Sequence, residues 1–295
     1  MTQSTGGHVL VSEETAKARI VAVIGGGRMG SGIAHAFLLA GNHVRLVEVS
    51  PEFQDTALAR VTKLVEASAS RGALTEGAEV VLARLSIHGE IVDVAGSNLV
   101  IEAVPENLDL KLSVLAAAGD VLGPESLLAT NTSSISINRL GVALPAKTRF
   151  LGLHFFNPVP ASLLVEIVRG AATSEETVTT AREWVECIAK TPIVVSDSPG
   201  FASSRLGLAL GLEAIRMVES GVATAEDIDQ AMVLGYKHPV GPLRLTDIVG
   251  LDVRLGIAQY LESELGERFT PPDLLATKVA EGHLGQKSGQ GFYQW

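Results

Sequence analysis

The 295-residue chain is poor in cysteine, in long apolar runs and in basic charge. Its single cysteine, Cys187, cannot form a disulfide within the chain and falls in a helical pattern, where we expect a small buried residue. No apolar run reaches the roughly 18 residues that span a bilayer, so no membrane partner is expected. The formal net charge of −10 argues against a nucleic-acid partner, because phosphate binding needs a basic surface.

The first residues, 1–18, lack the layout of a targeting segment. They have neither the basic and apolar regions of a signal peptide nor the Arg-rich, acid-poor composition of a transit peptide. We interpret them as a flexible N-terminal tail, and together with the single cysteine they favour a cytoplasmic location.

From residue 19 onward, short β-branched runs alternate with longer helical stretches. Such alternation predicts βαβ units and a parallel sheet with helices on both faces, over residues 19–200. Beyond residue 200 the apolar residues recur at helical spacing, with Gly and Pro at the breaks, which predicts a helical domain over residues 201–295. Because that region is apolar on many faces, it is expected to pack against a second copy of the chain.

A glycine-rich stretch, GGGRMG at residues 25–30, follows the first predicted strand and opens a helix. Gly25 permits a tight turn, Gly27 close approach to a pyrophosphate, and Gly30 close packing of helix on strand. An ordinary glycine-rich βα turn is the alternative. Glu48 ends the next strand, where an acid accepts hydrogen bonds from a ribose 2′-hydroxyl and repels a 2′-phosphate, so NAD is expected rather than NADP. A solvated acid at a strand end is the alternative for Glu48.

His154 differs from the other histidines because it lies inside the apolar run RFLGLHFF, directly before NPVP. Oxidation of an alcohol needs a group that takes the hydroxyl proton, and histidine is suited to this near neutral pH. Glu166 interrupts the next apolar run, LLVEIVRG, and a buried carboxylate is costly unless it is paired. If the two strands are neighbours, Glu166 can orient His154 as a general base. The alternative is a structural histidine and a separately satisfied glutamate.

The stretch ATNTSS, residues 129–134, ends a predicted strand at the sheet edge where ligands gather. Its hydroxyls and its amide can hold a carbonyl or a nicotinamide. Equally, they can cap the helix predicted in ISINRL, because Ser, Thr and Asn are preferred capping residues.

The chain resembles the 3-hydroxyacyl-CoA dehydrogenase family over nearly its whole length. The resemblance rests on VIGGGRMGSGIA, IEAVPENLDLK, NTSS, GLHFFNPVP, LVEIV, DSPGF, HPVGPLRLTDIVGLD and GQKSGQGFY. It implies NAD-dependent oxidation of a (3S)-3-hydroxyacyl-CoA to the 3-ketoacyl-CoA, with a short acyl group such as 3-hydroxybutyryl. It also implies a Rossmann-type, doubly wound, mainly parallel α/β domain followed by an all-helical domain that forms a homodimer.

The same resemblance assigns roles to individual residues. His154 becomes the general base, Glu166 its orienting carboxylate, and Ser133 a ligand of the substrate oxygen near the nicotinamide. No metal is assigned, and the implied NAD contacts are Gly25, Gly27, Met29, Gly30, Glu48, Glu106, Lys111, Asn131, Ser133 and Asn157. A solvated ion pair on the first turns of a helix is the alternative for Glu106 and Lys111.

Two features concern substrate binding. The family usually has Asn four residues after the glycine of P-G-F, but PGFASSR has Ser204 there, whose shorter reach puts the substrate-orienting role in doubt. Arg60, Lys63 and Arg71 share one face of the helix predicted after Glu48, where they can meet the CoA phosphates outside the cleft. Simple solvation, with favourable charge near a helix C-terminus, is the alternative.

Two other functions stay open on the residues alone. One is an NAD-dependent dehydrogenase of a free 3-hydroxy acid or sugar acid on the same fold. The other is a non-catalytic dinucleotide-binding protein, since a fold does not by itself imply a reaction.

Overall fold

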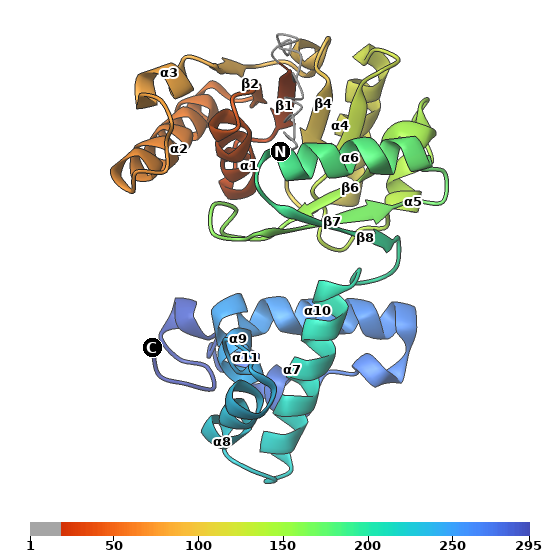
Figure 1. The fold of residues 1–295 in the computed structure, drawn as a ribbon. Helices are drawn as coiled ribbons and strands as arrows, with labels where there is room; N and C mark the ends of the chain where they lie inside the picture. The colour runs from red at the N-terminus through yellow and green to blue at the C-terminus, as the bar shows by residue number, and fades with distance from the viewer. Residues whose placement is uncertain (1–18) are drawn as a thin grey trace, which may run out of the picture.

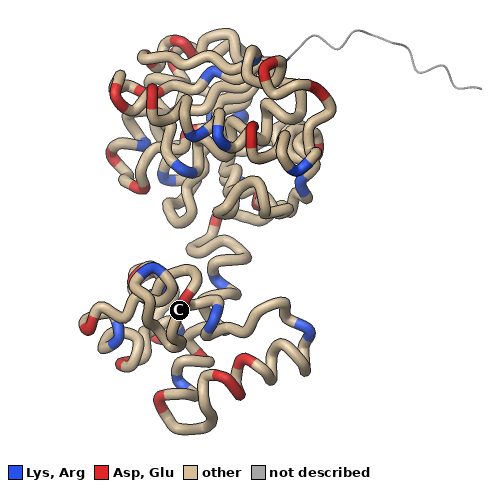
Figure 2. Tube along the Cα trace, turned by 90° about the vertical axis from the view of Figure 1, so that its left-hand side faces the viewer, with Lys and Arg blue, Asp and Glu red and all other residues tan. Residues whose placement is uncertain are grey.

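The structure is a computed structural model that describes residues 19–295, so the tail predicted over residues 1–18 lies outside the described residues. The described chain forms two lobes, an α/β lobe and a helical lobe (Figure 1). Acidic and basic residues are intermixed on both lobes (Figure 2), so neither lobe presents a surface of one charge sign only.

The α/β lobe contains one eight-stranded sheet in the order β3-β2-β1-β4-β5-β6-β7-β8. Neighbouring strands are parallel except for the antiparallel pair β6 and β7. The predicted mainly parallel sheet is therefore confirmed. The strands are β1 (Ile20–Ile24), β2 (His43–Val47), β3 (Leu85–His88), β4 (Leu99–Glu102), β5 (Leu127–Thr130), β6 (Phe150–Phe155), β7 (Leu164–Arg169) and β8 (Thr191–Ser196).

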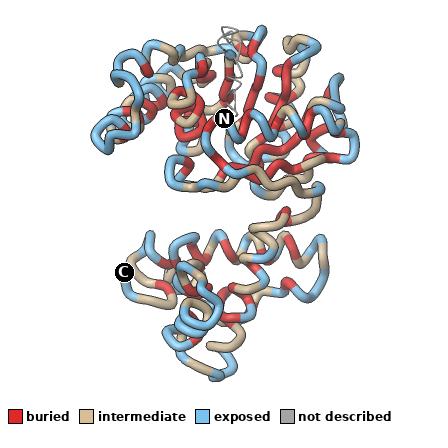
Figure 3. Tube along the Cα trace, viewed as in Figure 1, coloured by how far each residue is buried: buried red, intermediate tan, exposed pale blue. Residues whose placement is uncertain are grey.

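Helices cover both faces of this sheet. Side chains alternate between the two faces along each strand, and because both sets are apolar, each face packs against helices. Val21 and Val23 of β1 share a core with α1 (Arg28–Leu39), α2 (Pro51–Ser70) and α6 (Glu175–Cys187). Ala22 and Ile24 share a second core with α4 (Leu108–Val121) and α5 (Ile137–Gly141). The inner strands β4, β5 and β6 are consequently buried along their whole length (Figure 3), whereas the edge strands β3 and β8 are only partly buried. The shorter helical segments of this lobe are α3 (Ala78–Leu82) and the 3₁₀ turns Ile91–Val94 and Lys147–Arg149.

The helical lobe has its own apolar core, built on Leu208, Leu212, Leu243 and Leu261. It is reached through the connection 197–202, within which the boundary predicted near residue 200 lies. No helix within residues 19–295 has the combined length and apolarity needed to cross a bilayer. The elements of the helical lobe are α7 (Ser203–Glu219), α8 (Ala225–Gln230), the π-helical turn Ala231–Gly235, α9 (Pro242–Val249), α10 (Leu251–Leu265), α11 (Asp273–Ala280) and the 3₁₀ turns Glu267–Phe269 and Gln286–Ser288.

The C-terminal residues fold back onto α9 and are held there by Asp247. Its carboxylate accepts hydrogen bonds from the backbone N–H groups of Phe292 and Tyr293, both at 2.9 Å, and from Nε1 of Trp295 at 2.8 Å. A Cβ atom at Gly291 would lie 2.2 Å from Oδ1 of Asp247, so only glycine fits there. The motifs HPVGPLRLTDIVGLD and GQKSGQGFY thus stabilise the helical lobe together.

Candidate active site

A cleft of about 1040 Å³ separates the two lobes at the carboxyl ends of the parallel strands. It opens where the strand order reverses between β1 and β4, the position at which doubly wound sheets bind ligands. The glycine loop and the ends of β2, β4, β5 and β6 line it from one lobe, and α7, α9 and α10 line it from the other.

The glycine loop between β1 and α1 has the geometry that a pyrophosphate requires. Gly25 has a φ of +105°, which favours glycine, and a Cβ atom there would lie 2.8 Å from the carbonyl oxygen of Ala103. A Cβ atom at Gly30 would lie 1.8 Å from the carbonyl oxygen of Gly25, so helix and strand can approach only with glycine. A Cβ atom at Gly27 would meet no atom within 4 Å outside its chain neighbours, so the space in front of the start of α1 is open. The loop therefore fits a dinucleotide at the N-terminus of α1.

Glu48 lies directly after β2 and against the glycine loop. Its Oε2 accepts a hydrogen bond from the N–H of Gly26 at 2.9 Å, and its Oε1 accepts one from the N–H of Val49 at 3.1 Å. These bonds fix the carboxylate, and each oxygen keeps a second lone pair that can accept a further hydrogen bond.

Of the three basic residues predicted on α2, the structure places only Arg60 in the cleft. Its Nη1 donates to the carbonyl oxygen of Gly26 at 3.1 Å. The expected position outside the cleft is thus wrong for Arg60, because α2 packs so closely on the loop that a Cβ atom at Gly26 would lie 2.4 Å from that of Ala57. Lys63 and Arg71 are exposed and do not line the cleft, and Nη2 of Arg71 donates to Ser68 at 3.3 Å.

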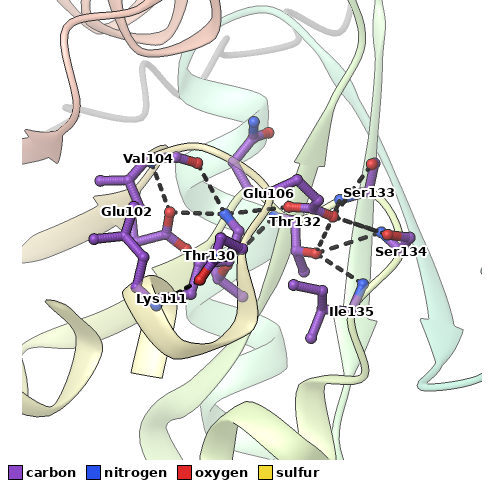
Figure 4. Close-up of polar contacts among 12 residues, drawn as sticks. Glu102, Val104, Glu106, Lys111, Thr130, Thr132, Ser133, Ser134 and Ile135 are labelled. Atoms are coloured by element: carbon purple, nitrogen blue, oxygen red, sulfur yellow. Dashed lines mark hydrogen bonds and ion pairs between the residues drawn. The ribbon is translucent and has the colours of Figure 1, made fainter. Parts of the chain in front are cut away.

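Lys111 is buried rather than solvated, so the alternative of a surface ion pair is wrong for this residue. Its Nζ lies 2.8 Å from Oε1 of Glu102 and 3.3 Å from Oε2 of Glu106, which gives one ammonium two carboxylate partners (Figure 4). Lys111 and Glu102 expose 1% and 0% of their side chains. Glu102 also accepts from the hydroxyl of Thr130 at 2.6 Å, which joins the ends of β4 and β5.

Glu106 links the loop after β4 to the segment that follows β5. Its Oε1 accepts from the hydroxyl of Thr132 at 2.6 Å and from the N–H groups of Ser133 and Ser134, both at 3.0 Å (Figure 4). Partial burial by itself raises the pKa of Glu106, but the Lys111 ammonium and these hydrogen bonds outweigh it and hold the pKa below its ordinary value. The carboxylate is therefore ionised at neutral pH.

The segment 129–134 borders the cleft, and helix α5 is capped by a different residue. Ser136 is the cap, because its hydroxyl accepts from the N–H of Arg139 at 3.2 Å. Asn131 and Ser133 line the cleft. The Oδ1 of Asn131 accepts from the N–H of Phe155 at 2.9 Å, which ties β5 to β6 and leaves its Nδ2 without a partner among residues 19–295.

His154 and Glu166 lie directly opposite each other on the antiparallel strands β6 and β7. Nδ1 of His154 is 2.7 Å from Oε2 of Glu166, and the Glu166 side chain is fully buried. Ser203 completes the shell of Glu166: its hydroxyl donates to Oε2 and its N–H to Oε1, both at 2.9 Å. The neighbouring Ser204, which the sequence places at the substrate-orienting position, lines the cleft and makes no side-chain hydrogen bond within the described chain.

The environment keeps Glu166 ionised. Burial by itself raises the pKa of this carboxyl. The hydrogen bonds from His154 and Ser203 lower the pKa by more than burial raises it, so the pKa lies below its ordinary value. Because an ionised carboxylate only accepts hydrogen bonds, Nδ1 of His154 carries the proton and Nε2 of the neutral ring carries a lone pair. The ring packs against Phe156 and Phe201, with centroid distances of 4.5 Å and 5.6 Å, and the residue borders the cleft.

The remaining predicted residues divide between the cleft and its surroundings. Met29 and Asn157 line the cleft with the glycines and Glu48, whereas Gly30 and Glu166 lie behind its surface. The charged and polar residues that were not predicted include Glu102, which binds Lys111, and Ser203 and Arg254, which line the cleft. Glu102 ends the apolar run NLVIEAV and was detectable by the same rule that singled out Glu166, but no local pattern marks the other two.

Comparison with known proteins covers both lobes. Residues 20–198 match the family described as 3-hydroxyacyl-CoA dehydrogenase, NAD binding domain, and residues 200–295 match its C-terminal domain. The chain is 41% identical to the 3-hydroxybutyryl-CoA dehydrogenase of Mycobacterium tuberculosis over 93% of this chain and 98% of that protein. It is 40% identical to that of Bradyrhizobium diazoefficiens over 93% and 94%. The crystal structure of (S)-3-hydroxybutyryl-CoA dehydrogenase from Ralstonia eutropha superposes with a TM-score of 0.90 at 37% identity, covering 95% of this chain and 99% of that one.

Proposed function

The chain belongs to the 3-hydroxyacyl-CoA dehydrogenase family of NAD-dependent oxidoreductases, and on that premise we propose that it interconverts a short (3S)-3-hydroxyacyl-CoA and its 3-ketoacyl-CoA with His154 as the general base. The observation that carries this proposal is the 2.7 Å contact between His154 and the buried Glu166, made at the edge of the cleft that also holds the glycine loop. The related proteins named for 3-hydroxybutyryl-CoA support a four-carbon acyl group as the first substrate to test.

The cleft has the residues to hold NAD in the order that the chemistry needs. The glycine loop and the start of α1 would take the pyrophosphate, Glu48 the adenosine ribose, and Glu106, Lys111 and Asn131 the nicotinamide half. NAD, when bound, supplies the hydride acceptor for the substrate carbon.

His154 would take the hydroxyl proton at Nε2, and the ionised Glu166 would stabilise the imidazolium that results. Such help contributes roughly 10²- to 10⁴-fold in rate. Ser133 and Ser204 are the hydroxyl groups available to hold the substrate oxygen, because both border the cleft. Outside the cleft, Lys63 and Arg71 remain the candidates for the CoA phosphates.

Exposed apolar residues on the helical lobe support a homodimer formed through this lobe. Leu206, Leu234 and Tyr236 expose 70%, 65% and 75% of their surface. Large apolar side chains at this exposure are unfavourable in water, and a second copy of the chain would cover them.

The experiment that tests the function compares the wild type with His154→Gln. With acetoacetyl-CoA and NADH, turnover should fall by roughly 10²- to 10⁴-fold while NADH binding, followed by fluorescence, is kept. The exposed His43, changed to Gln, is the matched control. Unchanged turnover in the His154 variant would remove this residue from the mechanism.

The substrate distinguishes the two other functions. A dehydrogenase of free acids would reduce acetoacetate at least as fast as acetoacetyl-CoA, and a non-catalytic protein would bind NADH stoichiometrically without reducing any 3-ketoacyl-CoA. We expect reduction of the thioester only.

A further inference from the structure

Arg254 of α10 is a buried cation without a partner. The residue is 6% exposed, and its guanidinium makes no hydrogen bond and no ion pair with any residue of 19–295. Its Nε is fully enclosed and unsatisfied. Burial lowers the pKa of Arg254 to about 10, so the side chain is still charged at neutral pH. Native proteins rarely leave such a group uncompensated, which points to a ligand that completes it.

The guanidinium borders the substrate cleft rather than the core of the helical lobe. Arg254 lines the cleft together with Gly207 of α7 and the apolar residues Leu245, Val249 and Ile257. A Cβ atom at Gly207 would lie 3.6 Å from Nη1 of Arg254, which shows that the guanidinium packs directly on α7.

The position along α7 sets the distance from the reacting centre. Ser203, which binds Glu166, is one helical turn before Gly207, and one turn rises about 5.4 Å. A group bound by Arg254 is thus separated from the His154 and Glu166 pair by a short apolar stretch. That stretch suits a few methylene groups, and the charge at its end suits an anion.

We propose that Arg254 binds a carboxylate at the far end of the acyl chain, so that the substrate is the CoA thioester of a short dicarboxylic 3-hydroxy acid. A carboxylate matches the planar fork of a guanidinium with two parallel hydrogen bonds and supplies the negative charge that the site lacks. A methyl-ended chain supplies neither. The inference rests on the proposed function, because it assigns the acyl end of the same substrate.

The experiment uses two substrates of equal carbon number, 3-oxoadipyl-CoA and 3-oxohexanoyl-CoA, which differ only in a terminal carboxylate or methyl group. For the wild type, kcat/KM should be higher with the carboxylate. In Arg254→Met the ratio of the two kcat/KM values should fall by roughly 10- to 100-fold, as expected for a lost charge-assisted contact. Arg254→Lys, which keeps the charge without the fork, should lie between them. Arg182→Met on the exposed face of α6 is the matched control and should leave the ratio unchanged.

Calorimetric titration of 3-oxoadipyl-CoA without NADH gives a second readout, in which the Met variant should bind more weakly than the wild type. The inference would be overturned if the wild type had the higher kcat/KM with 3-oxohexanoyl-CoA, or if Arg254→Met left the ratio of the two kcat/KM values unchanged. It would also be overturned if the wild type reduced acetoacetyl-CoA but neither of the two six-carbon substrates. Loss of a dimer in the Met variant without a change in the ratio would instead assign Arg254 to the subunit interface. If the Met variant does not fold, the two wild-type rates decide. A wild type that reduces no 3-ketoacyl-CoA at all would contradict the proposed function itself.

Discussion

His154 and Glu166 face each other across an antiparallel strand pair with 2.7 Å between Nδ1 and Oε2. The register places both at one level of the sheet, and the Glu166 side chain is enclosed on all sides. The pair therefore has a fixed geometry and a fixed tautomer, which is the arrangement that a general base requires.

Glu166→Gln should lower kcat by roughly 10²- to 10⁴-fold, because an amide can hold the ring in the wrong tautomer and cannot stabilise the imidazolium.

Glu166→Gln should also change how the free energy of unfolding depends on pH. The pKa of Glu166 is below its unfolded value of 4.5, so its stabilisation is complete above that value and is lost as the pH falls through the folded pKa. Urea unfolding at neutral and acidic pH should show a smaller acid-induced loss in the variant than in the wild type. The exposed Glu183→Gln serves as control, and equal losses in all three proteins would contradict the prediction.

Lys111→Met should destabilise the α/β lobe by roughly 3–5 kcal/mol, because it leaves the fully buried Glu102 without its cation. Adding Glu102→Gln to this variant removes the stranded charge and should recover part of the loss. Urea unfolding of the two variants measures the difference. If Lys111→Met alone were as stable as the wild type, Lys111 would contribute to cofactor binding and not to stability.

Two glycines of the loop should separate stability from binding. Gly30→Ala forces a Cβ atom into the backbone of Gly25 and should lower both the thermal unfolding temperature and NADH affinity. Gly27→Ala meets no atom within 4 Å, so stability should be kept while the methyl group obstructs the pyrophosphate and NADH affinity falls. Fluorescence titration with NADH and thermal unfolding test both. Unimpaired NADH binding by the Gly27 variant would place the pyrophosphate elsewhere.

Ser204→Asn should preserve or raise turnover of acetoacetyl-CoA. Serine reaches less far into the cleft than the amide, and its hydroxyl has no partner among the described residues, so a longer polar group can be accommodated. Steady-state kinetics with the KM for the thioester decides the point. Complete loss of activity would show that the site is adapted to serine.

The chain should sediment as a dimer, and the double variant Leu234→Glu, Tyr236→Glu should shift it toward the monomer by placing charge in the covered surface. Val142→Glu, at an exposed position of the α/β lobe, is the control and should remain dimeric. Analytical ultracentrifugation distinguishes the species. A double variant that stays dimeric would place the interface elsewhere.

The sequence by itself determined the layers of the fold, the dinucleotide loop and the candidate pair at His154 and Glu166. These follow from local rules: side chains alternate in strands, glycines are required where backbones meet, and a polar residue inside an apolar run needs a partner. Such rules act over a few residues and can be read along the chain.

Only the tertiary structure decided which residues complete the site. Ser203, rather than its neighbour Ser204, reaches Glu166, because the start of α7 aims its N–H group and hydroxyl at the carboxylate. Lys111 is buried because β4 places Glu102 beneath it, and Arg254 borders the cleft because α10 packs across α7. Each of these contacts joins segments brought together by packing between elements, which no local periodicity records.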